Sequence, residues 1–245
     1  MAPARVRTQK GYADAEHRTA MTPCRLSVII PALDEEDLVC HAVRSVKDEA
    51  EVIVVDGGSR DRTRALAEAE GAAVLSVPAG RGRQLDAGAR RASGDWLVFL
   101  HADTRLAAGW APALRRLATD VVGGAFRFAI DSPGLGYRIV EAGVALRCRL
   151  WSLPFGDQCL FVRREIYETI GGFLPVPLME DVAFVRRLSR VGPLVFPPVR
   201  ALTSARRWER QGIVTTTIQD WWLLGLYAVG RPPEQLARLY DRQPK

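Results

Sequence analysis

Three apolar runs rich in β-branched residues dominate the hydrophobic pattern of the first half of the chain. They lie within residues 26–36, 51–59 and 95–103, and acids follow each one. Continuous apolar runs of this length are typical of strands buried on both faces, as in parallel sheets covered by helices. Ligands bind outside the carboxyl ends of such strands. We therefore expect Asp34, Asp56 and Asp103 to converge on one crevice.

Helical spacing of apolar residues fills the segments between these runs. It predicts helices over residues 34–50, with Asp34 or its neighbour as the cap, over 59–70, ended by Gly71, and over 83–92, with a short strand over 73–77. This alternation of strands and helices predicts an α/β fold with right-handed crossovers.

The pattern changes after residue 104. Helices are expected over residues 107–119, 136–150 and 180–189, and a strand with one exposed face over 123–130. We expect the second half to extend the sheet of the first. Residues 1–23 carry basic side chains without an apolar core, so we expect a flexible basic leader rather than a secretory signal. Residues 24–245 are expected to form a single domain.

Composition and charge narrow the classes of function. The chain of 245 residues is 48% hydrophobic and 25% charged, which is typical of a soluble globular protein. Its formal net charge of +6 favours anionic partners such as nucleotide phosphates. The basic residues are not interleaved with aromatic ones, so we expect no nucleic acid partner. The four cysteines follow no paired spacing, which favours free thiols in the reducing cytoplasm.

One aromatic segment raises the question of a membrane. No run of about 18 apolar residues exists, so we expect no transmembrane helix. Residues 221–231 contain two tryptophans and are flanked by arginines. Core packing is the simpler interpretation. The alternative is a peripheral contact with the inner face of the membrane, which would suit a lipid-linked substrate.

The common phosphate-binding loops are missing. No Walker A motif is present, and the segment starting at Gly80 and Gly82 resembles G-x-G-x-x-G but has Leu85 in place of the third glycine. A dinucleotide site is therefore not expected. What remains is a basic turn, where Arg81 and Arg83 at a helix N-terminus would suit a diphosphate.

Six motifs, taken in order, resemble those of family 2 inverting glycosyltransferases. They are Ser27-Val-Ile-Ile-Pro-Ala-Leu-Asp-Glu35, the segment from Val52 through Asp56-Gly-Gly-Ser to Thr63, Phe99-Leu-His-Ala-Asp103, Gly156-Asp-Gln158, Gly171-Gly-Phe173 and Met179-Glu-Asp181. The resemblance covers residues 26–208. It implies a GT-A fold, with a mostly parallel central sheet flanked by helices, a nucleotide-binding half over 24–104 and an acceptor half with C-terminal helices over 105–245. It also implies transfer of a sugar, with inversion, from a nucleoside diphosphate, commonly UDP, to a hydroxyl acceptor.

The resemblance implies a set of nucleotide contacts, namely Pro31, Ala32, Leu33, Glu35, Asp56, Arg83, His101, Ala102 and Arg207. In this set Asp56 would bind the base. Its structural alternative is a turn former before Gly57, while Asp34 and Glu36 are more typical of helix caps or a solvated face. Arg207 resembles the arginine of a Q-x-x-R-W motif whose glutamine position is Ser204 or Thr203 here, so it faces either phosphate or solvent.

A divalent cation is also implied. Asp103 matches the last acid of the family's D-x-D motif, which holds Mg²⁺ or Mn²⁺ on the diphosphate, but His101 stands where the first acid belongs. Oxygen ligands suit both cations, and a histidine ligand would favour Mn²⁺. His101 is thus a candidate metal ligand or nucleotide contact. Asp95, at the other end of the strand, is interpreted as a turn residue.

For catalysis, the resemblance gives Asp181 the role of the base that deprotonates the acceptor hydroxyl. Asp157, Gln158, Glu180 and Trp208 would contact the acceptor. The structural alternative for Asp181 and Glu180 is capping of the helix that begins there.

Two other functions compete. A degenerate transferase acting as a nucleotide-sensing or interaction module is supported by His101 in the metal motif. A sugar nucleotidyltransferase also uses an α/β sheet and a metal carboxylate, but it has a Gly-rich loop after its first strand, where this chain has Pro31-Ala-Leu-Asp34.

Overall fold

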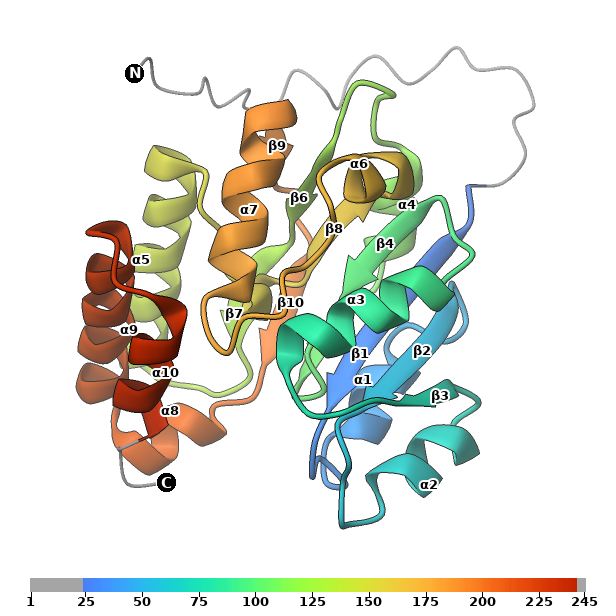
Figure 1. Cartoon of the computed structure of the whole chain (residues 1–245), viewed down its shortest axis with the longest axis horizontal. Helices are drawn as coiled ribbons and strands as arrows, with labels where there is room; N and C mark the ends of the chain where they lie inside the picture. Colours follow the sequence, from blue (N-terminus) through green and yellow to red (C-terminus); the bar gives the residue numbers. More distant parts are fainter. Residues whose placement is uncertain (1–23, 242–245) are drawn as a thin grey trace.

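A seven-stranded sheet forms the centre of the computed structural model, which describes residues 24–241 (Figure 1). The expected leader, residues 1–23, lies outside the described residues. The strand order is β3 (Ala73–Ser76), β2 (Glu51–Asp56), β1 (Leu26–Ala32), β4 (Trp96–Phe99), β8 (Leu160–Arg163), β6 (Gly123–Ala125) and β9 (Leu194–Val195). The first four strands are parallel, β8 is antiparallel to both of its neighbours, and β6 and β9 are parallel. The expected mostly parallel α/β sheet is confirmed, and β6, β8 and β9 extend it from the second half.

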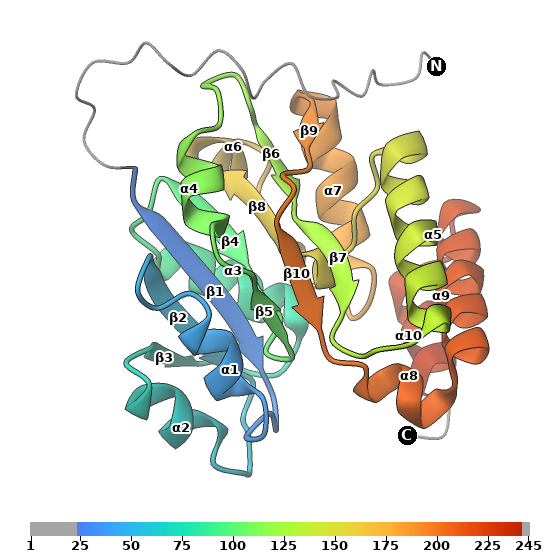
Figure 2. The ribbon, with the colours of Figure 1, turned by 180° about the vertical axis from the view of Figure 1, so that it is seen from behind.

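Two apolar cores cover the faces of this sheet because successive residues of a buried strand point to opposite sides. Ile29 of β1 packs with α3 (Arg81–Arg91), α6 (Arg164–Thr169) and α7 (Glu180–Val191). Its neighbour Ile30 packs with α1 (Val39–Arg44), α2 (Thr63–Ala69) and α4 (Trp110–Arg115). Figure 1 shows α3 and α7 on the first face, and Figure 2 shows α1 and α4 on the second.

A second sheet of three strands corrects one prediction. Its order is β5 (Thr104–Leu106), β10 (Arg200–Thr203) and β7 (Arg127–Ile130). The single strand expected over 123–130 is split at the buried Phe126, and its two parts join different sheets. The exposed face is also wrong, since only Arg127 is exposed. A Cβ on Gly124 would lie 1.9 Å from the carbonyl oxygen of Val195, so the backbones pack too closely for alternating side chains.

The predicted helices exist, but three are shorter than expected. The helix expected over 34–50 spans only α1, that expected over 59–70 spans only α2, and that expected over 107–119 spans only α4. Asp34 does not cap α1, because it has a left-handed φ of 53° and its Oδ1 accepts a hydrogen bond from the Arg60 amide. The Glu35 amide likewise donates to Thr63 Oγ1. These bonds hold residues 34 and 35 against the segment that runs from the loop after β2 into α2. Both residues therefore lie outside the helix, which begins at Val39.

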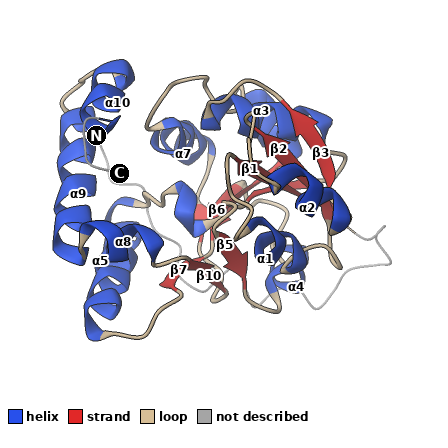
Figure 3. Ribbon diagram, turned by 90° about the horizontal axis from the view of Figure 1, so that it is seen from below, coloured by secondary structure: helices blue, strands red, loops and turns tan. Residues whose placement is uncertain are grey.

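Four helices of the second half lie beside the two sheets (Figure 3). They are α5 (Leu135–Trp151), α8 (Arg206–Gln211), α9 (Ile213–Ala228) and α10 (Pro233–Asp241). A third cluster of buried residues, including Phe128, Tyr137 and Trp208, joins α5, α8 and α9 to β7, and α10 packs against α9. Within residues 24–241, no helix has the length and apolar character needed to cross a bilayer. All four cysteines are unpaired, as expected.

Candidate active site

The carboxyl ends of β1, β2 and β4 form the floor of the candidate site. Ala32 at the end of β1 pairs with Asp56 at the end of β2, and the Gly57 amide donates to the Ala32 carbonyl. Gln84 of α3 fastens this edge, because its Nε2 donates to the carbonyl oxygens of Ala32 (3.0 Å) and Val55 (2.8 Å). The sequence pattern alone gives Gln84 no role. The one signal for it is a polar residue on the apolar face of a predicted helix.

Asp56 is buried, with 1% of its surface exposed. Its carboxylate accepts hydrogen bonds from the amides of Gly58 (3.0 Å) and Ser59 (3.1 Å), so it forms the turn that the alternative interpretation described. A carboxylate has further lone pairs. Its contact with a nucleotide base therefore stays a prediction, as do the contacts of the neighbouring Pro31, Ala32 and Leu33.

Arg206, rather than Arg207, lies beside the predicted nucleotide loop. Its Nη2 donates to both carboxylate oxygens of Glu35 at 2.9 Å. Burial raises the pKa of Glu35, while Arg206 opposes this shift. Arg207 instead pairs with Asp220 of α9 and lies 5.6 Å from the Tyr240 ring. Successive helical residues point about 100° apart, so only one of the two arginines at the start of α8 can face β1.

His101 and Asp103 lie in the loop after β4, with Ala102 buried between them. Burial lowers the pKa of His101 to about 4, with a further contribution from Arg81, so the imidazole is uncharged at neutral pH and one of its two ring nitrogens has a lone pair that can bind a metal. Its Nε2 lies 2.8 Å from where a Cβ on Gly156 would stand. Any side chain at this position would displace the imidazole.

The residues present fit a cation shared with a diphosphate. Among residues 24–241, no group of three or more His, Cys, Asp or Glu side chains is placed to hold a metal by itself. The protein would therefore supply one or two ligands, Asp103 with or without His101. Phosphate oxygens would supply others, as is usual for Mg²⁺ sites with phosphate substrates.

Asp181 and Glu180 lie in the first turn of α7. Asp181 Oδ2 accepts a hydrogen bond from the Gly156 amide (2.8 Å), and its Oδ1 accepts from the Val182 amide (2.7 Å). Glu180 is buried and pairs with Arg81 at 3.2 Å. Burial raises the pKa of Glu180, against the influence of Arg81. Its carboxylate therefore fixes an arginine of α3, and a direct acceptor contact stays a prediction.

Of the two adjacent residues predicted to contact an acceptor, only Asp157 is available. Gln158 is buried, and both ends of its amide bind the protein: Oε1 accepts from Arg147 and from the Phe155 amide, and Nε2 donates to the Phe126 carbonyl. These bonds give Gln158 a structural role, and its acceptor contact stays a prediction. Burial raises the pKa of Asp157 to about 7, and its buried Oδ1 has no hydrogen-bond partner in the described chain.

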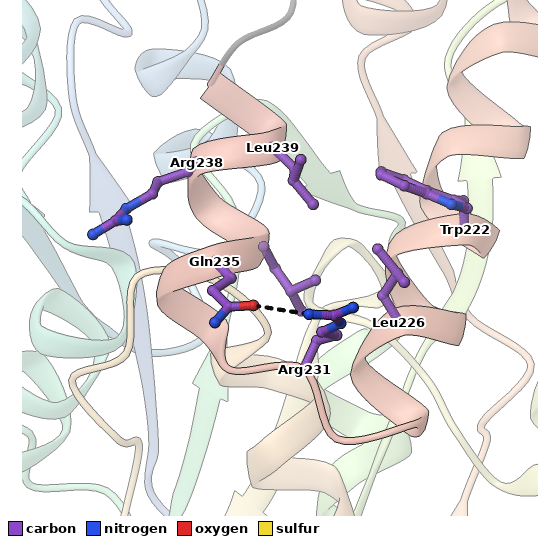
Figure 4. Close-up of a pocket in the computed structure, with 7 residues that line it drawn as sticks. Trp222, Leu226, Arg231, Gln235, Arg238 and Leu239 are labelled. Carbon is purple, nitrogen blue, oxygen red and sulfur yellow. Dashed lines mark hydrogen bonds between the residues drawn. The ribbon is translucent and has the colours of Figure 1, made fainter.

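A groove of about 440 Å³ runs between α5 and α9 and reaches Asp157 and Trp208. A second pocket, of about 400 Å³, lies between α9 and α10 (Figure 4). It is lined by Trp222 and Leu226 of the predicted membrane-contact segment, and Arg231 donates there to Gln235 at 3.5 Å. None of the predicted catalytic or metal-binding residues lines it. Arg83 is exposed at the first turn of α3, away from both pockets.

Comparison with known proteins places these features in a family. The model of "Glycosyl transferase family 2" matches residues 27–171. Glucosyl-3-phosphoglycerate synthase of Mycolicibacterium paratuberculosis is 34% identical over 107 residues, which cover 38% of this chain and 32% of the relative. Glycosyltransferase AglJ of Haloferax volcanii is 39% identical over 64 residues, or 25% of this chain and 21% of that protein. The matched part is thus a third or less of the length of these relatives.

Solved structures of the same class share the fold. Glucosyl-3-phosphoglycerate synthase from Mycobacterium tuberculosis, in complex with Mn²⁺, UDP-glucose and phosphoglyceric acid, is 22% identical with a TM-score of 0.53, covering 82% of this chain and 85% of that chain. The same enzyme with Mg²⁺ and UDP gives a TM-score of 0.55 at 22% identity, covering 82% and 84%. S. aureus TarS gives 0.56 at 16% identity, covering 73% and 60%. The chain belongs to glycosyl transferase family 2 and has the GT-A fold.

Proposed function

We propose that the protein transfers a sugar, with inversion, from a nucleoside diphosphate, with UDP as the first candidate, to a hydroxyl acceptor. One observation carries the proposal. Gly156 joins the two halves of the chemistry, since its amide binds Asp181 Oδ2 at 2.8 Å and its Cα faces the ring of His101. The predicted base and the predicted metal loop are therefore adjacent, although they come from α7 and from the end of β4.

In this proposal each residue has a distinct task. Asp103, with His101, would hold Mn²⁺ or Mg²⁺, and the bound ion supplies charge neutralisation for the leaving diphosphate. Arg81 and Arg83 at the start of α3 and Arg206 at the start of α8 add positive charge around the same crevice. Asp181 takes the proton of the acceptor hydroxyl. At the same time the hydroxyl oxygen attacks the anomeric carbon from the face opposite the diphosphate.

The acceptor and the location belong to the proposal as well. A lipid-linked acceptor would bring residues 221–231 to the inner face of the membrane, with the rest of the protein in the cytoplasm. The side chains of Trp221 and Trp222 support this, because both are exposed while the adjacent Leu223 and Leu224 are buried. Such a surface suits an interfacial helix.

Hydrolysis of the nucleotide sugar tests the transferase chemistry without knowledge of the acceptor. Water takes the place of the acceptor hydroxyl in this reaction, although the reaction is slow. Purified protein is incubated with Mn²⁺ and UDP-, GDP- or dTDP-sugars, and NMR follows the anomeric configuration of the released sugar. We expect inverted sugar from one donor class and none from Asp181→Asn. Asp95→Asn, at the opposite end of β4, is the matched control and keeps the rate. Binding without hydrolysis would favour the sensing module, and pyrophosphate release from UTP and a sugar 1-phosphate would favour the nucleotidyltransferase.

A further inference from the structure

The groove between α5 and α9 has two apolar walls. Ile139, Val140 and Val144 form the α5 wall, and Val214, Ile218 and Trp221 form the α9 wall. Its volume of about 440 Å³ is within the usual range of small-molecule sites. Of the two glycines of α5 that line it, Gly143 faces open space, whereas a Cβ on Gly136 would lie 2.8 Å from Ile213 Cδ1, so the helices approach closely at that end. Such a space is suited to a hydrocarbon body and not to a sugar.

The apolar character continues from the walls to the rim. Leu135 of α5 and Val214 of α9 are 78% and 69% exposed. Further exposed apolar residues of these two helices are Ile139, Leu146, Leu150, Trp151, Ile218, Trp221 and Trp222. Many exposed apolar side chains on two helices that contact each other indicate an interaction surface.

The inner end of the groove is polar and belongs to the candidate active site. Asp157 lines it, and its Oδ1 is buried without a hydrogen-bond partner among the residues described. Buried polar atoms are almost always hydrogen-bonded, so we expect a molecule bound in the groove to donate a hydrogen bond to this oxygen of Asp157. Asp157 follows Gly156, whose amide binds Asp181. A molecule lying in the groove therefore presents its inner end to the predicted base.

We propose that this groove binds the hydrocarbon body of the acceptor, so that the acceptor is an amphiphilic alcohol whose hydroxyl lies at Asp157. The inference rests on the proposed function. The acceptor O–H proton passes to Asp181, the oxygen forms a bond to the anomeric carbon, and the diphosphate leaves with the electrons of the broken C–O bond. A second copy of the chain seated in the groove would cover Asp157 and close this route, which is why we assign the groove to a substrate.

Quenching of tryptophan fluorescence by 8-bromo-octan-1-ol measures occupancy, because Trp208 and Trp221 line the groove. Gly143→Phe should fill it: a Cβ at Gly143 meets no atom within 4 Å, so the ring can enter without displacing backbone. The matched control is Ala142→Phe, on the exposed surface of the same helix and outside the groove lining. We expect saturable quenching in the wild type and Ala142→Phe, and affinity about tenfold weaker or worse in Gly143→Phe.

The role of Asp157 is tested with 1-bromo-octane, which has no hydroxyl. The wild type should bind the alcohol more tightly than the alkane, and Asp157→Leu should lose this preference. Equal quenching of the wild type and Gly143→Phe would overturn the groove assignment, as would a wild-type dimer that Ile139→Asp dissociates and that binds no alcohol. Hydrolysis of the nucleotide sugar, measured on the wild type and on Ala142→Phe, reports separately on the proposed function, since residue 142 lies outside the groove lining and its replacement should leave the hydrolysis rate unchanged.

Discussion

Arg206 donates from one Nη2 to both carboxylate oxygens of Glu35, at 2.9 Å each, across 171 positions of sequence. The pair ties the loop after β1 to the first turn of α8. Glu35 is largely buried and lies within electrostatic reach of Asp103. Arg206 therefore offsets negative charge in the crevice where a diphosphate would have to bind.

Replacing Arg206 should impair the donor site, whereas replacing Arg207 should not. Arg206→Ala leaves the Glu35 carboxylate without its partner and raises the negative charge near Asp103, so we expect UDP affinity to fall about tenfold, or roughly 1–2 kcal/mol. Arg207→Ala breaks a pair with Asp220 on α9 and should leave UDP affinity close to that of the wild type. Titration calorimetry of both variants with UDP measures the two affinities and shows which arginine supports the donor site. The opposite ranking would restore the phosphate contact that sequence alone gave to Arg207.

Asp181→Asn should separate chemistry from donor binding. The amide keeps the shape of the side chain but cannot take a proton, so we expect the transfer or hydrolysis rate to fall about 10²- to 10⁴-fold. Affinity for UDP should change little, since Asp181 accepts its hydrogen bonds from the amides of Gly156 and Val182, which lie outside the loops after β1 and β2. Single-turnover rates and calorimetry on the same preparation test this. A variant that turns over at the wild-type rate would reduce Asp181 to a structural role in the first turn of α7.

The buried carboxyl of Asp157 predicts a dependence of stability on pH. Its pKa is about 7 in the folded protein, against an ordinary value of 3.8. Between these values the folded state retains a proton that the unfolded chain has released, so this residue's contribution to stability falls as the pH rises from about 4 to 7. The upper limit is about 4 kcal/mol, and solvent in the open groove reduces it. Urea unfolding from pH 4.5 to 8 should show a smaller loss for Asp157→Asn than for the wild type. Parallel curves for the two proteins would refute it.

Gly82 explains how closely α3 approaches the segment before α7. A Cβ at this position would lie 2.2 Å from the carbonyl oxygen of Leu174 and 3.3 Å from Glu180 Cβ. Gly82→Ala should therefore destabilise the fold by about 1–3 kcal/mol and disturb the pair between Arg81 and Glu180. The control is Gly225→Ala in α9, where nothing lies within 4 Å and helix propensity predicts a gain of about 0.5–1 kcal/mol. Equal melting temperatures of the wild type and Gly82→Ala would contradict this, because they would show that α3 and the segment before α7 can move apart at no cost.

The sequence predicted the four parallel strands β1 to β4 of the large sheet, three of them through the apolar pattern that burial on both faces leaves, but it did not predict β8 or β9. The second sheet could not be predicted. Residues 123–130 contain two strands of different sheets, and the break at Phe126 depends on the approach of β9 and β10, which are distant in sequence. The late start of α1, at Val39 instead of residue 34, has a similar cause, since Asp34 bonds to Arg60 in the loop after β2 and Glu35 bonds to Thr63 at the start of α2.

The sequence indicated which acids lie in the candidate site. It indicated less well which arginine faces the crevice and which glutamine side chains have a structural role. Motif order indicated Asp103, Asp157 and Asp181, and the fold brings them to one end of the sheet. Which arginine faces the crevice depends on the rotation of α8, and a motif does not encode this rotation. In the sequence, nothing distinguishes Gln158 and Gln84 from glutamines that could contact a ligand. In the fold, the amide group of each donates to a backbone carbonyl that is distant in sequence.

The most direct test of the account is calorimetric titration of the protein with UDP, with and without Mn²⁺, repeated on Asp103→Ala and with GDP and dTDP as alternative nucleotides. We predict UDP binding that requires both the metal and Asp103, because residues 24–241 bring together too few ligands to hold the ion without a diphosphate. UDP binding of equal strength without Mn²⁺ or in Asp103→Ala, or no binding of any of the three nucleotides, would contradict it.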